Sequence, residues 1–85
     1  MMDWNVVSVT PTAPLGLTVR FVDGTEGKVR FEPTHLRGVF EALNDPAFFS
    51  QARVECGVVT WPGEIDLAPD AMYREIQRTG EWVLR

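Results

Sequence analysis

Three carboxylates in the segment WPGEIDLAPD are the first residues whose types and spacing suggest chemistry. Glu64, Asp66 and Asp70 follow one another around a proline-containing turn. Two carboxylates a few ångströms apart in different environments can act as general acid and base. Several convergent oxygens can instead bind a hard cation. Three acids also occur in ordinary solvated loops, so we expect no catalytic residue, no metal and no cofactor here.

The same segment could bind a partner protein. Trp61 would then be an apolar anchor, Pro62 would shape the surface, and Asp66 would accept hydrogen bonds. In the structural alternative, Pro62 and Gly63 turn the chain out of a strand, Asp66 caps a following helix, and Asp70 meets the positive end of its dipole. We favour the structural alternative and keep Trp61, Pro62 and Asp66 as candidate partner contacts.

A nucleophilic cysteine needs an exposed, electropositive setting and a nearby base. His35 and Cys56 are the only residues of their types in the chain. Cys56 ends the alternating segment ARVEC at an inward position, so we expect a buried structural thiol, and we expect a solvated His35. No phosphate-binding glycine loop, G-x-S-x-G motif or metal-binding histidine pair is present. We therefore predict that the protein is not an enzyme.

Arg20, Lys28 and Arg30 are the basic residues that the pattern brings together, on the outer face of a predicted hairpin. They could form a solvated face that limits aggregation, or bind an acidic partner, or hold nucleic acid jointly with another protein. Eight Lys and Arg against twelve Asp and Glu give a net charge of −4. Nucleic-acid binding rests on an excess of basic residues, so we expect no direct nucleic-acid partner.

Alternating apolar residues predict the strands that position these side chains. The first three strands are predicted at 4–11, 15–22 and 28–32. The segment DGTEG between the last two indicates a hairpin. A bulge at Gly27, or a longer loop, would set Val19 beside Val29 and Leu17 beside Phe31 on the inner face.

A helix is predicted over 33–43, because apolar residues recur there at i, i+3, i+4 and i+7. Gly38 within it suggests close packing against the sheet. The following NDPAFF breaks the helix and offers Phe48 and Phe49 to the core.

A strand pair at 52–56 and 58–62 comes next, followed by a helix at 69–79 that Gly80 ends. The tail EWVLR either folds back over the sheet or adds to the edge of another chain. The order β-β-β-α-β-β-α predicts one α+β domain over 1–85, with a small antiparallel sheet and two helices.

The chain has no apolar run of about 18 residues and no basic secretory leader, so we expect a cytoplasmic protein without a membrane partner.

Three segments together carry a family resemblance: LTVRFVDGTEGKVRFEP, GVFEALNDPAFFSQARVE and VVTWPGEIDLAPDAMY. They closely resemble the bacterial domain-of-unknown-function family 2442 (DUF2442), whose structural type is the NE0471 N-terminal-domain-like fold. The resemblance runs from about Val6 to Tyr73. It rests on the combination of F-x-D-G, F-x-x-L-x-D-P-x-x-F and W-P-x-x-x-D-L-x-P-D.

The resemblance implies an α+β fold in a bacterial cytoplasmic protein and brings no established catalytic residues. Some relatives carry a helix-turn-helix region after this domain, and some are encoded beside small proteins in proposed toxin–antitoxin pairs. Since the sequence ends at Arg85, we expect no such DNA-binding extension in this chain.

Together these observations lead to the hypothesis of a non-catalytic interaction module that binds another small protein or itself, as the antitoxin-like member of a pair. The alternative is a nucleic-acid-associated regulator that acts with a partner. The third hypothesis is a small-molecule or metal-dependent enzyme.

Overall fold

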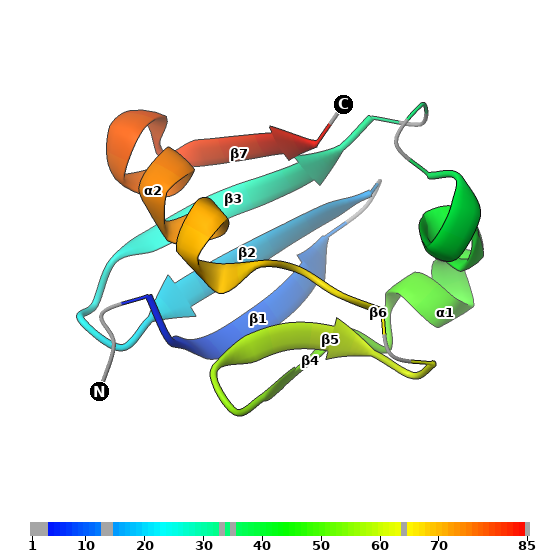
Figure 1. The fold of residues 1–85 in the computed structure, drawn as a ribbon, viewed down its shortest axis with the longest axis horizontal. Helices are drawn as coiled ribbons and strands as arrows, with labels where there is room; N and C mark the ends of the chain where they lie inside the picture. The colour runs from blue at the N-terminus through cyan, green and yellow to red at the C-terminus, as the bar shows by residue number, and fades with distance from the viewer. Residues whose placement is uncertain (1–3, 13–14, 33, 35, 64, 85) are drawn as a thin grey trace.

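Two β-sheets and one long helix surround the core in a computed structural model of the chain (Figure 1). The structure describes residues 4–12, 15–32, 34, 36–63 and 65–84. One sheet has the order β1-β2-β3-β7 and the other the order β4-β5-β6. The strands are β1 (Val6–Thr12), β2 (Gly16–Phe21), β3 (Glu26–Phe31), β4 (Arg53–Glu55), β5 (Val58–Trp61), β6 (Ile65–Asp66) and β7 (Glu81–Leu84). The helices are the 3-10 helix η2 (Gly38–Asn44), α1 (Pro46–Phe49) and α2 (Pro69–Thr79).

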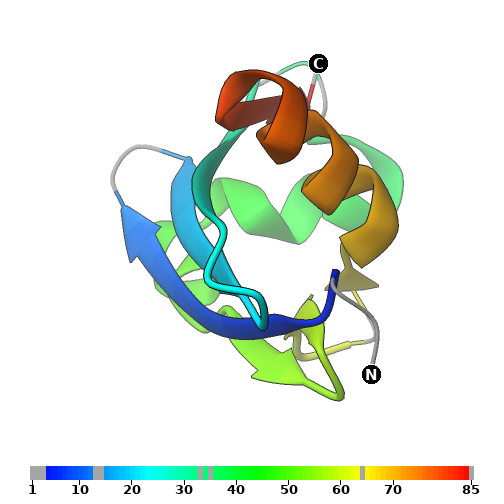
Figure 2. The same ribbon diagram turned by 90° about the vertical axis from the view of Figure 1, so that its left-hand side faces the viewer.

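This arrangement confirms the predicted α+β class and, in outline, the order of elements. The larger sheet is mixed rather than antiparallel, because β7 pairs parallel with β3. The tail therefore folds back onto its own sheet and becomes an edge strand. Helix α2 lies across one face of this sheet, while η2 and α1 lie at one end of it (Figures 1 and 2).

The β2–β3 hairpin has the predicted inner face but a different register. Leu17 pairs with Val29 and Val19 pairs with Gly27, so the predicted bulge at Gly27 and the pairing of Val19 with Val29 are wrong. The Phe21 N–H donates to the Thr25 carbonyl at 2.8 Å, which leaves a three-residue loop that includes Gly24 at φ +91°. Such a loop shifts the pairing by two residues and so keeps every side chain on its predicted face.

Gly27 has a packing role in place of the bulge. A Cβ atom added there would lie 2.9 Å from both Cδ1 and Cγ1 of Ile76, and closer still to its Cγ2. Ile76 is buried on α2, so the missing side chain of Gly27 is what lets the helix approach β3.

Helix α2 has the bounds that the sequence predicts. Pro69 occupies its first position, where the missing N–H is harmless. Gly80 ends it in the left-handed conformation (φ +85°) and donates its N–H to the Ile76 carbonyl at 2.7 Å. Met72 and Ile76 form its buried side.

The first predicted helix is wrong in type and extent. The main helical stretch in this part of the described chain is Gly38–Asn44, and it is a 3-10 helix. Gly38 is exposed at φ +60°, and a Cβ there would meet nothing within 4 Å, so its role is conformational and not close packing. A positive φ cannot continue a right-handed helix, which explains the late start. Leu36 and Leu43 are nevertheless buried.

Phe48 and Phe49 reach the core as predicted, from the single turn of α1. Phe49 is buried and Phe48 packs against the core in a half-buried position. Asp45 begins this turn by accepting the Ala47 N–H at 3.0 Å.

The β4–β5 connection corrects the expectation for Cys56. The turn consists of Cys56 and Gly57, both at positive φ (+52° and +80°), as in a type I′ hairpin. Cys56 is therefore exposed at a hairpin tip and is not a buried thiol.

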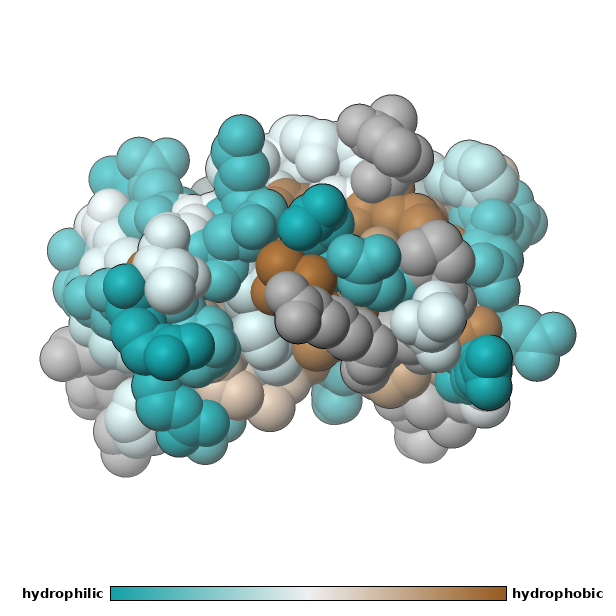
Figure 3. Space-filling view, turned by 90° about the horizontal axis from the view of Figure 1, so that it is seen from above, coloured by the Kyte–Doolittle hydropathy of each residue, from teal (hydrophilic) through white to brown (hydrophobic). Residues whose placement is uncertain are grey.

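The free edge of β7 is partly closed by its own chain. The carbonyls of Gly80 and Leu84 accept the backbone N–H groups of Lys28 and Glu32. The backbone N–H and carbonyl groups of Glu81 and Val83 therefore point away from β3. The Thr79 hydroxyl lies 2.9 Å from the Glu81 carbonyl oxygen and 3.4 Å from its nitrogen. This hydroxyl therefore occupies the backbone groups of Glu81 that another strand would need for pairing. On this side, hydrophobic atoms show only in small areas between hydrophilic ones (Figure 3).

No helix in the described part of the chain is long and apolar enough to cross a membrane.

A polar network joins α2 to the β2–β3 loop. The Tyr73 hydroxyl donates to Asp23 Oδ2 at 2.6 Å, and Thr25 N–H donates to Asp23 Oδ1 at 2.9 Å. Gln77 Nε2 donates to the Tyr73 hydroxyl and to Thr25 Oγ1. The hydrogen bonds that reach Asp23, the one from Tyr73 first and then those from Thr25, hold the pKa of Asp23 below its ordinary value of 3.8.

Tyr73→Phe is expected to raise the pKa of Asp23 toward 3.8. Because the folded state lowers this pKa, the ionised carboxylate stabilises the fold above pH 3.8, and that contribution disappears as the pH falls through the lowered value. The variant should lose part of this acid dependence. Titration of the Asp23 carboxyl carbon by NMR in both proteins checks the prediction, and an unchanged pKa would contradict it.

Candidate functional site

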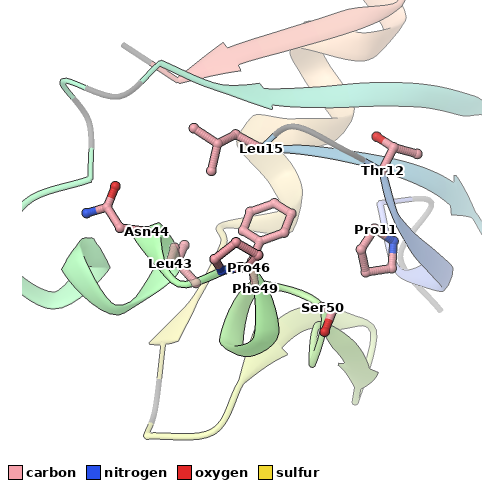
Figure 4. Close-up of a pocket in the computed structure, with 8 residues that line it drawn as sticks. All are labelled: Pro11, Thr12, Leu15, Leu43, Asn44, Pro46, Phe49 and Ser50. Atoms are coloured by element: carbon pink, nitrogen blue, oxygen red, sulfur yellow. The ribbon is translucent and has the colours of Figure 1, made fainter.

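An apolar pocket opens between the end of the β1–β2 pair that carries Thr12 and Leu15 and the η2–α1 segment (Figure 4). Its volume is about 470 Å³, within the roughly 300–1,000 Å³ that is usual for binding pockets. It is lined by Pro11, Thr12, Leu15, Leu43, Asn44, Pro46, Phe49 and Ser50.

The described residues of the pocket lining carry no charged side chain. Its walls are proline, leucine and phenylalanine side chains, and its polar groups are two hydroxyls and one carboxamide. In a chain of net charge −4, this is an uncharged, mostly apolar concavity, which suits a neutral apolar group better than an ion.

The walls come from segments far apart in the sequence. Pro11 lies near the end of β1, opposite Leu17. Phe49 projects from α1, with its ring centroid 5.7 Å from that of Phe31 in an edge-on arrangement. The Phe49 carbonyl accepts the indole N–H of Trp61 at 2.9 Å. The core thereby fixes one wall of the pocket.

Leu15 has an unusual backbone for a branched residue. Its φ is +52°, a region that bulky side chains rarely adopt and that costs about 1–3 kcal/mol. The Phe31 N–H donates to the Leu15 carbonyl at 2.9 Å and holds this conformation. Strain of this kind concentrates at functional sites, and here the strained residue lines the pocket.

Two polar side chains of the pocket have their hydrogens engaged by the protein. Asn44 Nδ2 donates to the carbonyls of Glu41 at 3.1 Å and Leu36 at 3.4 Å. The Ser50 hydroxyl donates to the Ala47 carbonyl at 2.9 Å.

Trp61, which the sequence suggested as an anchor for a partner, lies in the core. Only 1% of it is exposed, so its side chain cannot reach a partner on the surface. Pro62 is half-buried, and Pro62 and Gly63 form the turn that the structural alternative predicted.

Asp66 is exposed but does not cap α2. It pairs with Thr60 as part of β6, and the N-cap position of α2 belongs to Ala68, which makes no side-chain capping bond. Asp70 does lie in the first turn of α2, where a negative charge is favourable.

The proposed carboxylate cluster and the proposed Cys–His pair each include a residue outside the described part of the chain. Glu64 and His35 are those residues. Among the His, Cys, Asp and Glu residues that the structure does describe, no group of three or more is placed to hold a metal ion.

Arg20, Lys28 and Arg30 are all exposed and share the outer face of the larger sheet, the face that α2 does not cover. Acidic residues lie among them: Glu26 pairs with Arg20, and Glu81 Oε2 is 3.7 Å from Arg30 Nε. This face is therefore mixed in charge.

Sequence reasoning missed the pocket. The segment NDPAFF indicated that Phe49 turns toward the core, but no spacing connects it with Pro11 or Leu15. Their proximity is a product of tertiary structure alone.

Comparison with known proteins gives a family-level match. The family model described as "Protein of unknown function (DUF2442)" matches residues 6–78. No curated protein matches the chain, and no solved structure does.

Proposed function

Because the chain belongs to the DUF2442 family, whose function is unknown, we propose a role from its geometry: a non-catalytic protein-interaction module that binds an apolar side chain of another protein in the pocket. The observation that carries this proposal is the pocket of about 470 Å³, whose described lining is uncharged and includes Leu15 at φ +52°.

The energetics of a buried anchor support the proposal. A large apolar side chain gains about 1.5–3 kcal/mol when it leaves water. Interfaces concentrate their affinity in a few such anchors seated in pockets. A pocket on a domain this small is a useful recognition feature, since most of its apolar side chains are already committed to the core.

The partner that we propose is a small bacterial protein in the cytoplasm, with this chain as the antitoxin-like member of the pair. The resemblance to relatives encoded beside small proteins supports this part of the proposal. The alternative of a regulator that holds nucleic acid with a partner would use the outer face with Arg20, Lys28 and Arg30. The interleaved Glu26 and Glu81 weaken the attraction of that face for phosphates.

The test compares Leu15→Asn with Val7→Asn in quantitative affinity capture from the native bacterium. Asparagine tolerates the left-handed conformation, so Leu15→Asn removes the apolar wall without adding backbone strain. Val7, an exposed apolar residue on β1 that does not line the pocket, is the matched control. Circular dichroism establishes that both variants fold.

We expect a stoichiometric small protein that the wild type and Val7→Asn retain and that Leu15→Asn loses by about tenfold or more, the equivalent of about 1.4 kcal/mol. Equal retention by Leu15→Asn and Val7→Asn would refute the pocket as the binding site. Recovery of this chain alone at physiological salt would refute the role itself.

A further inference from the structure

The hydrogen-bonding groups of the pocket are biased toward acceptors. Both hydrogens of the Asn44 carboxamide go to the carbonyls of Leu36 and Glu41. The opposite orientation of the amide would set its oxygen against those two carbonyls, so the network fixes the assignment. Asn44 Oδ1 is therefore left as an acceptor, and Figure 4 shows the carboxamide at one edge of the pocket.

Ser50 adds a second acceptor. Its single hydrogen is donated to the Ala47 carbonyl, which leaves the lone pairs of its oxygen. Thr12 contributes a hydroxyl that can donate or accept and so does not alter the bias. A ligand that matches this pocket needs an apolar body and a hydrogen-bond donor.

Charge complementarity narrows the choice. An anion would meet two acceptors and no cationic side chain among the lining residues that the structure describes. A cation would lose hydration in an apolar pocket whose described lining contains no carboxylate. The matching group is neutral, and tryptophan, whose indole N–H donates and does not accept, is the side chain that best combines these features.

We propose that the pocket binds a tryptophan side chain of the partner protein, with the indole N–H donated to one of the two acceptors that Asn44 and Ser50 provide. This inference rests on the proposed function and specifies the chemistry of the anchor. The aromatic body would pack against Pro11, Leu15 and Pro46, the apolar lining residues that are exposed or half-buried.

The experiment titrates the full chain with three neutral probes: N-acetyltryptophan amide, its 1-methylindole analogue, and N-acetylphenylalanine amide. The methyl resonances of Leu15 and Leu43 report binding by NMR. Methylation of the ring nitrogen removes the donor and keeps the aromatic body, so it isolates the proposed hydrogen bond. Leu15→Asn and the matched Val7→Asn show whether each probe occupies this pocket.

We expect the tryptophan probe to bind about fivefold or more tightly than its methylated analogue, as one hydrogen bond provides, and Leu15→Asn to weaken it. Equal affinity of all three probes would overturn the tryptophan assignment and leave an apolar-anchor pocket standing. Absence of shifts with every probe would also overturn it. The capture experiment then decides separately whether the interaction role survives.

Discussion

Replacing Trp61 with alanine is expected to lower the free energy of unfolding by about 3–5 kcal/mol, enough to unfold much of a domain of this size. The side chain is only 1% exposed. Its ring lies 6.2 Å from that of Phe31 and 5.8 Å from that of Phe49, between centroids. Alanine would leave a cavity among these aromatic rings.

Trp61→Phe separates the hydrogen bond from the packing. It keeps an aromatic ring but removes the indole N–H, so the Phe49 carbonyl loses its 2.9 Å bond. The same carbonyl still accepts the Ala52 N–H at 3.3 Å, so we expect a smaller loss of about 0.5–1.5 kcal/mol for the missing hydrogen bond. Urea denaturation followed by circular dichroism measures both variants, with Trp82→Phe, at a half-buried position on β7, as the control.

Wild-type stability in Trp61→Ala would contradict the core assignment. The expected result also has a practical meaning for binding studies. Loss of a partner by this variant would report unfolding and not the loss of a contact, whereas Leu15→Asn is designed to keep the fold.

The second large effect is expected at Gly27, where alanine should destabilise the protein by about 1–3 kcal/mol through overpacking. The new Cβ would lie 2.9 Å or less from side-chain atoms of Ile76. Ile76 is buried and branched at Cβ, so it has little freedom to turn aside. Helix α2 would have to move away from β3.

A double-mutant cycle tests this cause. Ile76→Ala removes the atoms that the new Cβ would meet, and alone it should cost about 2–5 kcal/mol. If steric overlap is the cause, Gly27→Ala should cost far less in that background, and the two effects should not add. If the two losses in the free energy of unfolding add, the cost of Gly27→Ala instead arises within β3 itself. Lys28→Ala, an exposed neighbour on the same strand, is the control for strand position.

The regular elements could be predicted because their signals are local. Alternation in β2 and β3 identifies inner and outer residues, and Pro69 and Gly80 mark both ends of α2. The hairpin register could not be predicted in the same way. Registers that differ by two residues put the same side chains on the same faces, so the apolar pattern does not distinguish them.

The remaining errors come from backbone conformation. The apolar spacing around Gly38 fits an α-helix, but that residue adopts a positive φ, which the spacing does not indicate. Cys56 continues the alternation of its strand, yet the two-residue turn places it outside. Non-glycine residues at positive φ, such as Cys56 and Leu15, carry no sequence signature of their own.

The candidate site was the least predictable feature. Trp61, Pro62 and Asp66 stand out in the sequence because they combine an aromatic residue, a turn and an acid, but Trp61 lies in the core and Pro62 lies in a turn. The pocket is made from individually ordinary residues, such as Leu15 and Ser50, which form a cavity only when two remote segments of the chain meet.

The parallel pairing of β3 with β7 also sets the order in which the chain can fold. Lys28 and Glu81 are neighbours in the sheet but lie more than fifty residues apart in the sequence. Closing such a loop is entropically demanding, and topologies rich in remote contacts fold slowly. The β1–β2–β3 meander requires only short closures, so we expect it to form early and β7 to join after α2 has docked. We therefore expect the strand that completes the sheet to be the last to acquire its hydrogen bonds, and the edge of β3 to be unpaired until then.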